Sequence, residues 1–123
     1  MNPKQNSFLP YGRQQIDDAD IAAVIDVLKS DYLTCGPAVD AFEHAFANKV
    51  GAKDSVVVSN GTAALHLAAL TLGLNAKDTV IVPTLTFLAT ASAPHLTGAE
   101  IIFSDVDPNT GLMTAETFSD ALS

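Results

Sequence analysis

Hydrophobic residues in the first part of the chain recur at the spacing of amphipathic helices. Over residues 17–30 they fall on one helical face, at positions Ile21, Val24, Ile25 and Leu28. A second helix is predicted over residues 37–50, because Pro37 suits a first helical position and Gly51 suits a C-terminal cap. Residues 1–16 show no such period, and we interpret them as an extended N-terminal arm.

The rest of the chain alternates between short β-branched runs and helical stretches. Strands are predicted over residues 56–59, 79–82 and 101–106, and the first two have no polar alternation. That pattern is typical of a parallel sheet that is covered on both faces. The fold class is therefore α/β, with three strands and flanking helices in one domain over residues 17–123. The remaining helices are predicted over residues 62–72, 86–96 (broken near Pro94) and 115–122, the last capped by Thr114.

Composition narrows the class of protein. Hydrophobic residues make up 48% and charged residues 16%, which predicts a folded core. The net charge of −8, with only six basic residues, argues against nucleic acid as a partner. The single cysteine, Cys35, excludes a disulfide within the chain and fits a reducing compartment. No signal-peptide pattern is visible, and the longest apolar run, residues 62–74, is too short and polar to span a membrane. We expect a cytoplasmic protein.

A turn between a predicted strand and a predicted helix has the features of an anion site. It consists of residues 59–63, Ser-Asn-Gly-Thr-Ala (the 59–63 turn). N–H groups at a helix start lack partners inside the helix, and Gly61 permits close approach of a phosphate or a positive φ. The turn is neither a Walker loop nor a dinucleotide fingerprint. The alternative interpretation is an ordinary helix cap.

Phe87 follows the strand predicted over residues 79–82. The carboxyl ends of parallel strands gather ligands, so its ring could stack on a flat cofactor. The alternative is that Phe87 is a core residue. We interpret the histidines, His44, His66 and His95, as packed or surface residues. We interpret Asp107 as part of a turn, with metal binding by Asp105 and Asp107 as the alternative, and we predict no metal site.

Five stretches in order resemble the DegT/DnrJ/EryC1/StrS family of pyridoxal-phosphate (PLP) dependent aminotransferases, which modify nucleotide-linked keto-sugars. The resemblance extends over nearly the whole chain from residue 8. The stretches are LPYGRQQID (9–17), LTCGPAVDAFE (33–43), VVVSNGTAALHLA (56–68), VIVPTLTFLATA (80–91) and FSDVDPNTGLM (103–113).

The resemblance implies roles for particular residues. It places the PLP phosphate at the 59–63 turn, on Gly61, Thr62 and Ala63, and the pyridine ring on Phe87. It places Tyr11, Arg13 and Gly36 near the sugar substrate or the interface of a homodimer. The LPYGRQQI and LTCGP segments resemble most the branch that aminates UDP-linked 4-keto-6-deoxy-N-acetylhexosamines on the way to pseudaminic acid, with glutamate as the expected amino donor.

The resemblance also implies what the chain lacks. The family's Schiff-base lysine is expected beyond residue 123, so no catalytic residue is assigned, and the lysines here are interpreted as surface residues. The chain is expected to be the N-terminal part of a longer protein and to have no transaminase activity alone. The family's seven-stranded sheet also implies unpaired strand edges and an uncovered core here.

Three other functions remain open at this stage. A family member could bind PLP and act as a sugar dehydratase or a sensor. The chain could be a non-enzymatic remnant that pairs with an intact subunit. It could also be a small phosphate-binding α/β domain of another class.

Overall fold

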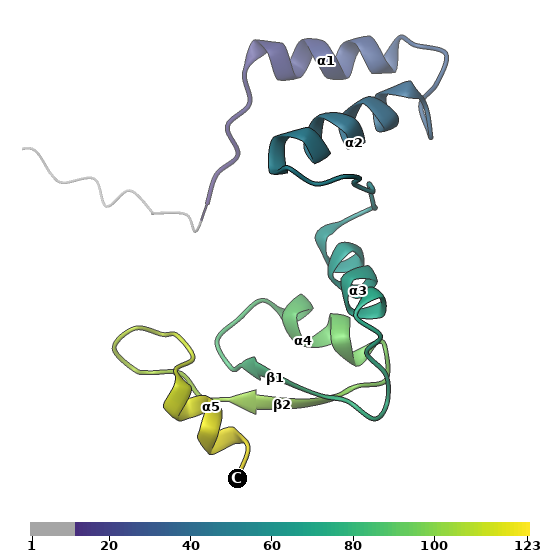
Figure 1. Cartoon of the computed structure of the whole chain (residues 1–123). Helices are drawn as coiled ribbons and strands as arrows, with labels where there is room; N and C mark the ends of the chain where they lie inside the picture. The colour runs from purple at the N-terminus through teal and green to yellow at the C-terminus, as the bar shows by residue number, and fades with distance from the viewer. Residues whose placement is uncertain (1–11) are drawn as a thin grey trace, which may run out of the picture. The chain divides into compact units, whose positions relative to one another are not determined.

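The structure is a computed structural model that describes residues 12–123, and it divides into two compact units (Figure 1). Of the described residues, 12–57 belong to the first unit and Val58–Ser123 form the second.

The first unit contains two helices whose ends follow from local sequence. α1 (Asp18–Leu28) begins with a capping box, in which Asp17 accepts N–H bonds from Ala19 and Asp20 while the Asp20 carboxylate accepts the Asp17 N–H at 3.0 Å. α2 (Pro37–Val50) starts at Pro37 and ends at Gly51, which adopts a left-handed φ of 70°. Both predicted helices are confirmed, each within two residues at either end.

The second unit is built around two parallel strands. β1 (Thr79–Pro83) pairs with β2 (Glu100–Ser104), with Thr79 opposite Glu100 and Pro83 opposite Ser104. Three helices complete the unit: α3 (Gly61–Thr71), α4 (Leu88–His95) and α5 (Ala115–Ala121). α4 connects the two strands and packs on α3, while α5 contacts β2 (Figure 1). The predicted parallel α/β arrangement is confirmed.

The strand predicted over residues 56–59 is wrong, so the sheet of the described residues has two strands where three were expected. A strand exists only where a neighbouring strand completes its hydrogen-bond ladder. The Val57 N–H donates to the carboxylate of Glu43 at 2.8 Å and to no strand, and the Val56 side chain is 76% exposed. The β-branched run is therefore an irregular connection.

The core of the described residues consists of small side chains. Large apolar side chains lie at the surface, with Leu72 80% and Phe103 57% exposed. This confirms the prediction of an uncovered core. The buried apolar residues are Ala47, Ala69, Val82, Ala89, Ala93, Pro94 and Ala99.

Within residues 12–123, none of the helices has both the length and the hydropathy needed to cross a bilayer.

Candidate functional site

The 59–63 turn leads directly into α3, and Asn60 shapes it. Asn60 is the N-cap of α3: its side-chain Oδ1 accepts the N–H of Ala63 at 2.9 Å, and its carbonyl accepts the N–H of Ala64 at 3.2 Å. Asparagine is among the preferred N-cap residues because its short side chain reaches these orphan donors. The side chain and carbonyl of Asn60 thus satisfy the N–H groups of Ala63 and Ala64 in the first turn of α3.

Two N–H groups of this turn are left for a ligand. Among the hydrogen bonds of the described residues, neither Gly61 nor Thr62 donates its backbone N–H to a protein acceptor. These amides stand at the positive end of the α3 dipole, which favours a bound anion. Gly61 does not have a positive φ, so of the two uses of a glycine that the sequence left open, close approach of a phosphate is the one that remains. A Cβ at Gly61 would meet nothing within 4 Å, so the chain itself does not require glycine there.

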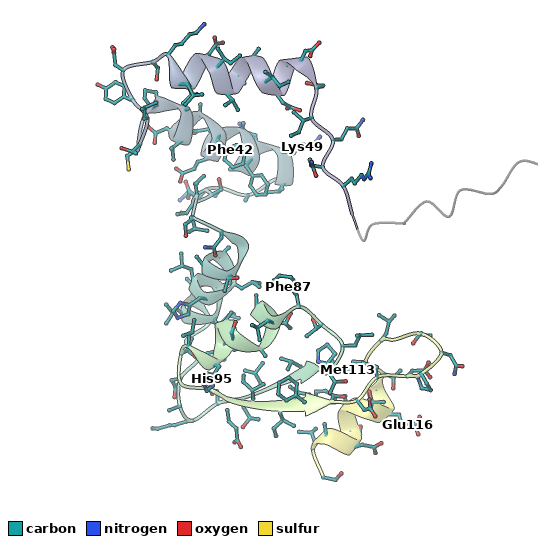
Figure 2. The ribbon with its side chains drawn as sticks, turned by 180° about the vertical axis from the view of Figure 1, so that it is seen from behind. Phe42, Lys49, Phe87, His95, Met113 and Glu116 are labelled. Carbon is teal, nitrogen blue, oxygen red and sulfur yellow. The ribbon has the colours of Figure 1, made fainter. Side chains whose placement is uncertain are left out.

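Phe87 lies beside this turn, in the same pocket. It is the N-cap of α4, just past β1, and its side chain is 80% exposed, which contradicts the core interpretation (Figure 2). It lines a pocket of about 660 Å³ together with Asn60, Gly61 and Thr62. Ala64, Leu65 and Ala89 complete the apolar wall. Three of the predicted site residues, Gly61, Thr62 and Phe87, are thus brought together from two segments of the second unit.

The remaining predicted site residues are placed differently. Ala63 does not line the pocket, and its N–H is used by Asn60. Gly36 lies in the first unit, at the N-cap of α2, where an added Cβ would come within 2.5 Å of the Tyr32 Cβ. Arg13 is exposed, and Tyr11 lies outside the described residues. Substrate contacts for Tyr11, Arg13 and Gly36 stay predictions.

Four residues that line the pocket, Asn60, Ala64, Leu65 and Ala89, were not among the predicted site residues, and Asn60 is the polar one of the four. Asn60 both caps α3 and lines the pocket, and its signal was present, because asparagine before a helical glycine is a typical N-cap.

The pocket contains no cationic side chain from the described residues. None of its lining residues is a lysine, and Lys29, Lys49, Lys53 and Lys77 are exposed elsewhere. An anion would therefore be held by backbone N–H groups and the helix dipole.

A second pocket, of about 560 Å³, runs along α4 and β2 and includes Leu88 and Phe103 but no residue of the 59–63 turn.

Asp107 belongs to a turn, as predicted, and hydrogen bonds of that turn act on its carboxylate. The N–H groups of Thr110 and Asn109 donate to its carboxylate at 2.9 and 2.8 Å, which lowers the pKa of Asp107 from its ordinary value. Gly111, with a φ of 68°, closes the turn. Residues 12–123 hold no group of three metal-binding side chains, and Asp107 does not line the pocket.

The chain belongs to the DegT/DnrJ/EryC1/StrS aminotransferase family, whose model matches residues 14–123. The structure is that of a partial α/β domain of the PLP-dependent fold type I class.

Individual relatives agree with this assignment. The chain is 42% identical over 109 residues to the UDP-4-amino-4-deoxy-L-arabinose–oxoglutarate aminotransferase of Shewanella sediminis, covering 89% of this chain and 28% of that protein. It resembles Spr1654 of Streptococcus pneumoniae in its PMP form, with 29% identity, a TM-score of 0.78, and 93% and 29% of the two chains covered. It also resembles the E. coli GDP-4-keto-6-deoxy-D-mannose-3-dehydratase with bound hydrated PLP, with 30% identity, a TM-score of 0.75 and coverage of 93% and 31%.

The chain thus spans less than a third of the length of these relatives.

Proposed function

We propose that this chain supplies the phosphate- and ring-binding part of a PLP-dependent sugar aminotransferase. The observation that carries the proposal is that the unpartnered N–H groups of Gly61 and Thr62 share a pocket with the exposed ring of Phe87. PLP combines a phosphate dianion with a flat aromatic ring. Its two ends match the two kinds of group that this pocket presents.

The residues of the pocket would divide the work of holding the cofactor. Gly61 and Thr62 donate N–H bonds to phosphate oxygens, assisted by the dipole of the 11-residue helix α3. Phe87 offers its face to the pyridine ring, which fixes the plane of the ring. The apolar wall formed by Leu65 and Ala89 keeps water from that side. When bound, PLP carries the amino group between donor and acceptor.

The substrate class follows from the relatives rather than from the pocket. We propose that the parent protein transfers an amino group, with glutamate as donor, to a nucleotide-linked 4-keto sugar. The Shewanella relative, named for a UDP-linked 4-amino sugar, supports this class. Within it, the LPYGRQQI and LTCGP segments favour a UDP-linked 4-keto-6-deoxy-N-acetylhexosamine of the pseudaminic acid branch.

A second candidate function is sugar dehydration. The similarity to the E. coli 3-dehydratase supports it, since that protein also carries PLP. The two activities differ in product, because an aminotransferase introduces nitrogen and a 3-dehydratase removes the oxygen at carbon 3. Mass spectrometry of the sugar formed by the parent protein distinguishes them.

The setting of the enzyme is proposed on the same basis. We propose a cytoplasmic homodimer: the free Cys35 supports a reducing compartment, and the homodimer rests on the family resemblance alone.

A titration with pyridoxamine phosphate tests the cofactor site directly. Pyridoxamine phosphate is the better probe because, unlike the aldehyde, it does not react with surface lysines. We expect the chain to bind it, inorganic phosphate to compete, and pyridoxamine without the phosphate to bind at least about tenfold more weakly. Equal affinity for the two amines would refute phosphate binding at the 59–63 turn.

A further inference from the structure

The segment that precedes the 59–63 turn is held by a single residue of α2. After Gly51 the chain reverses direction, with the N–H of Ala52 donating to the carbonyl of Ala47 at 2.9 Å. The Ser55 hydroxyl then donates to the carbonyl oxygen of Glu43 at 2.7 Å, and the Val57 N–H donates to Glu43 Oε1 at 2.8 Å. Backbone and side chain of Glu43 thus hold residues 55–57 at two points.

The contact to Val57 replaces a strand ladder. Because residues 56–59 have no partner strand among the described residues, the carboxylate of Glu43 is the acceptor that satisfies the Val57 N–H. Glu43 and Ser55 are half-buried, and so is the bond between them, whereas the bond from the Val57 N–H to the Glu43 carboxylate is exposed to solvent. A hydrogen bond from an N–H to a carboxylate is stronger than one between neutral groups.

We propose that Glu43 is a positioning residue for the 59–63 turn. Only Val58 separates the held N–H of Val57 from Ser59, so fixing the backbone at Val57 reduces the conformations open to the start of the turn. Glu43 does not line the pocket, and it acts through the chain rather than on a ligand. The inference rests on the proposed function, because phosphate binding is what an ordered turn would serve.

Three variants separate this role from a general effect on folding. Glu43→Ala removes the acceptor, Glu43→Gln keeps an acceptor oxygen without the charge, and Glu43→Asp keeps the charge with a shorter reach. Asp40→Ala is the matched control, since Asp40 is an exposed acid on the same helix whose side chain makes no hydrogen bond among the described residues.

Amide hydrogen exchange of the full chain, followed by NMR, is the first measurement. We expect Glu43→Ala to accelerate exchange at Val57 about tenfold relative to Asp40→Ala, and to accelerate it at Ser59 and Gly61 as well. Glu43→Gln should stay within about threefold of the original chain. Acceleration at Val57 without any at Ser59 and Gly61, or no acceleration at Val57, would overturn the proposal. Should Glu43→Ala fail to fold, Glu43→Asp must show the same pattern with smaller amplitude.

Affinity for pyridoxamine phosphate is the second measurement. Glu43→Ala should bind it about three- to tenfold more weakly than Asp40→Ala does, with Glu43→Gln restoring most of the loss. Equal affinities would overturn the role of Glu43 and leave the proposed function intact. If the original chain does not bind the probe, the proposed function fails, and hydrogen exchange alone decides the role of Glu43.

Discussion

Thr62 and Phe87 line the same pocket, although Thr62 lies in the first turn of α3 and Phe87 is the N-cap of α4, with β1 between them in the sequence. β1 ends at Pro83, Phe87 stands at the start of α4, and α4 packs on α3, so the ring of Phe87 shares a pocket with the start of α3. The N–H groups at the start of α3 and the ring of Phe87 can therefore contact the same ligand.

The contribution of Phe87 can be measured against its neighbour. Phe87 and Leu88 are 80% and 79% exposed, but Leu88 lines the other pocket. We expect Phe87→Ala to weaken pyridoxamine phosphate binding about fivefold, the value of one aromatic stacking contact, and Leu88→Ala to leave it unchanged. Fluorescence titration of both variants provides the comparison. Equal losses would mean that the ring of Phe87 does not contact the ligand.

Two substitutions of Asn60 distinguish its role in capping α3 from a role of the helix start in binding an anion. Asn60→Ala removes the acceptor for the Ala63 N–H and should cost about 1 kcal/mol of unfolding free energy. Asn60→Asp keeps the cap but places a negative charge at the pocket, so the unfolding free energy should be preserved while phosphate affinity falls. Urea denaturation and phosphate titration measure the two effects. Unchanged affinity in Asn60→Asp would place the anion away from this helix start.

Gly36 is required by the shape of its loop, whatever its part in substrate binding. Its added Cβ would lie 2.5 Å from the Cβ of Tyr32, an atom close to the backbone that cannot swing aside. We expect Gly36→Ala to lower the unfolding free energy by about 1–3 kcal/mol. Gly12→Ala is the control, since nothing lies within 4 Å of that position. Denaturation curves that coincide for the two variants would contradict this reading of the loop.

The turn that begins at Asp107 should be stable to mild acid. N–H donation from Thr110 and Asn109 lowers the pKa of Asp107. The folded turn therefore gains stability from the ionised carboxylate at pH values above the ordinary aspartate pKa. That contribution is lost only as the pH falls through the lowered pKa. NMR titration of the carboxyl carbon and of the Thr110 amide should give a midpoint below the ordinary pKa of 3.8, and Asp107→Asn should abolish the titration. A midpoint above that value would refute the assignment.

None of the described lysines lines the pocket. The chain alone should bind the cofactor without turning over glutamate, because no amine from the described residues lies in the pocket to relay a proton. Measuring 2-oxoglutarate formation with and without added cofactor checks this. Sustained turnover would require a catalytic amine that the pocket does not show.

Local signals predicted the helices well, whereas one strand required information from elsewhere in the chain. Asp17, Pro37 and Gly51 act within a few residues of the helix ends that they define, so sequence pattern was sufficient. Residues 56–59 have strong β propensity but no partner strand among the described residues, and propensity cannot supply one.

The candidate site was predictable to a similar degree. The places of Gly61, Thr62 and Phe87 at element ends left an ordinary helix cap and a core phenylalanine as alternatives, and the family resemblance singled out these three residues, which the fold brings together in one pocket. Which N–H groups remain available depended on the side chain of Asn60, and this required coordinates: the cap takes the N–H of Ala63 and leaves those of Gly61 and Thr62.

The buried side chains of the described residues include none larger than that of Val82. Alanine packing withdraws little apolar area from water per residue, so the heat capacity increment on melting should be small and the calorimetric transition broad. A sharp endotherm from this chain would indicate that its exposed leucines and phenylalanines are buried in an oligomer. The transition temperature would then depend on protein concentration.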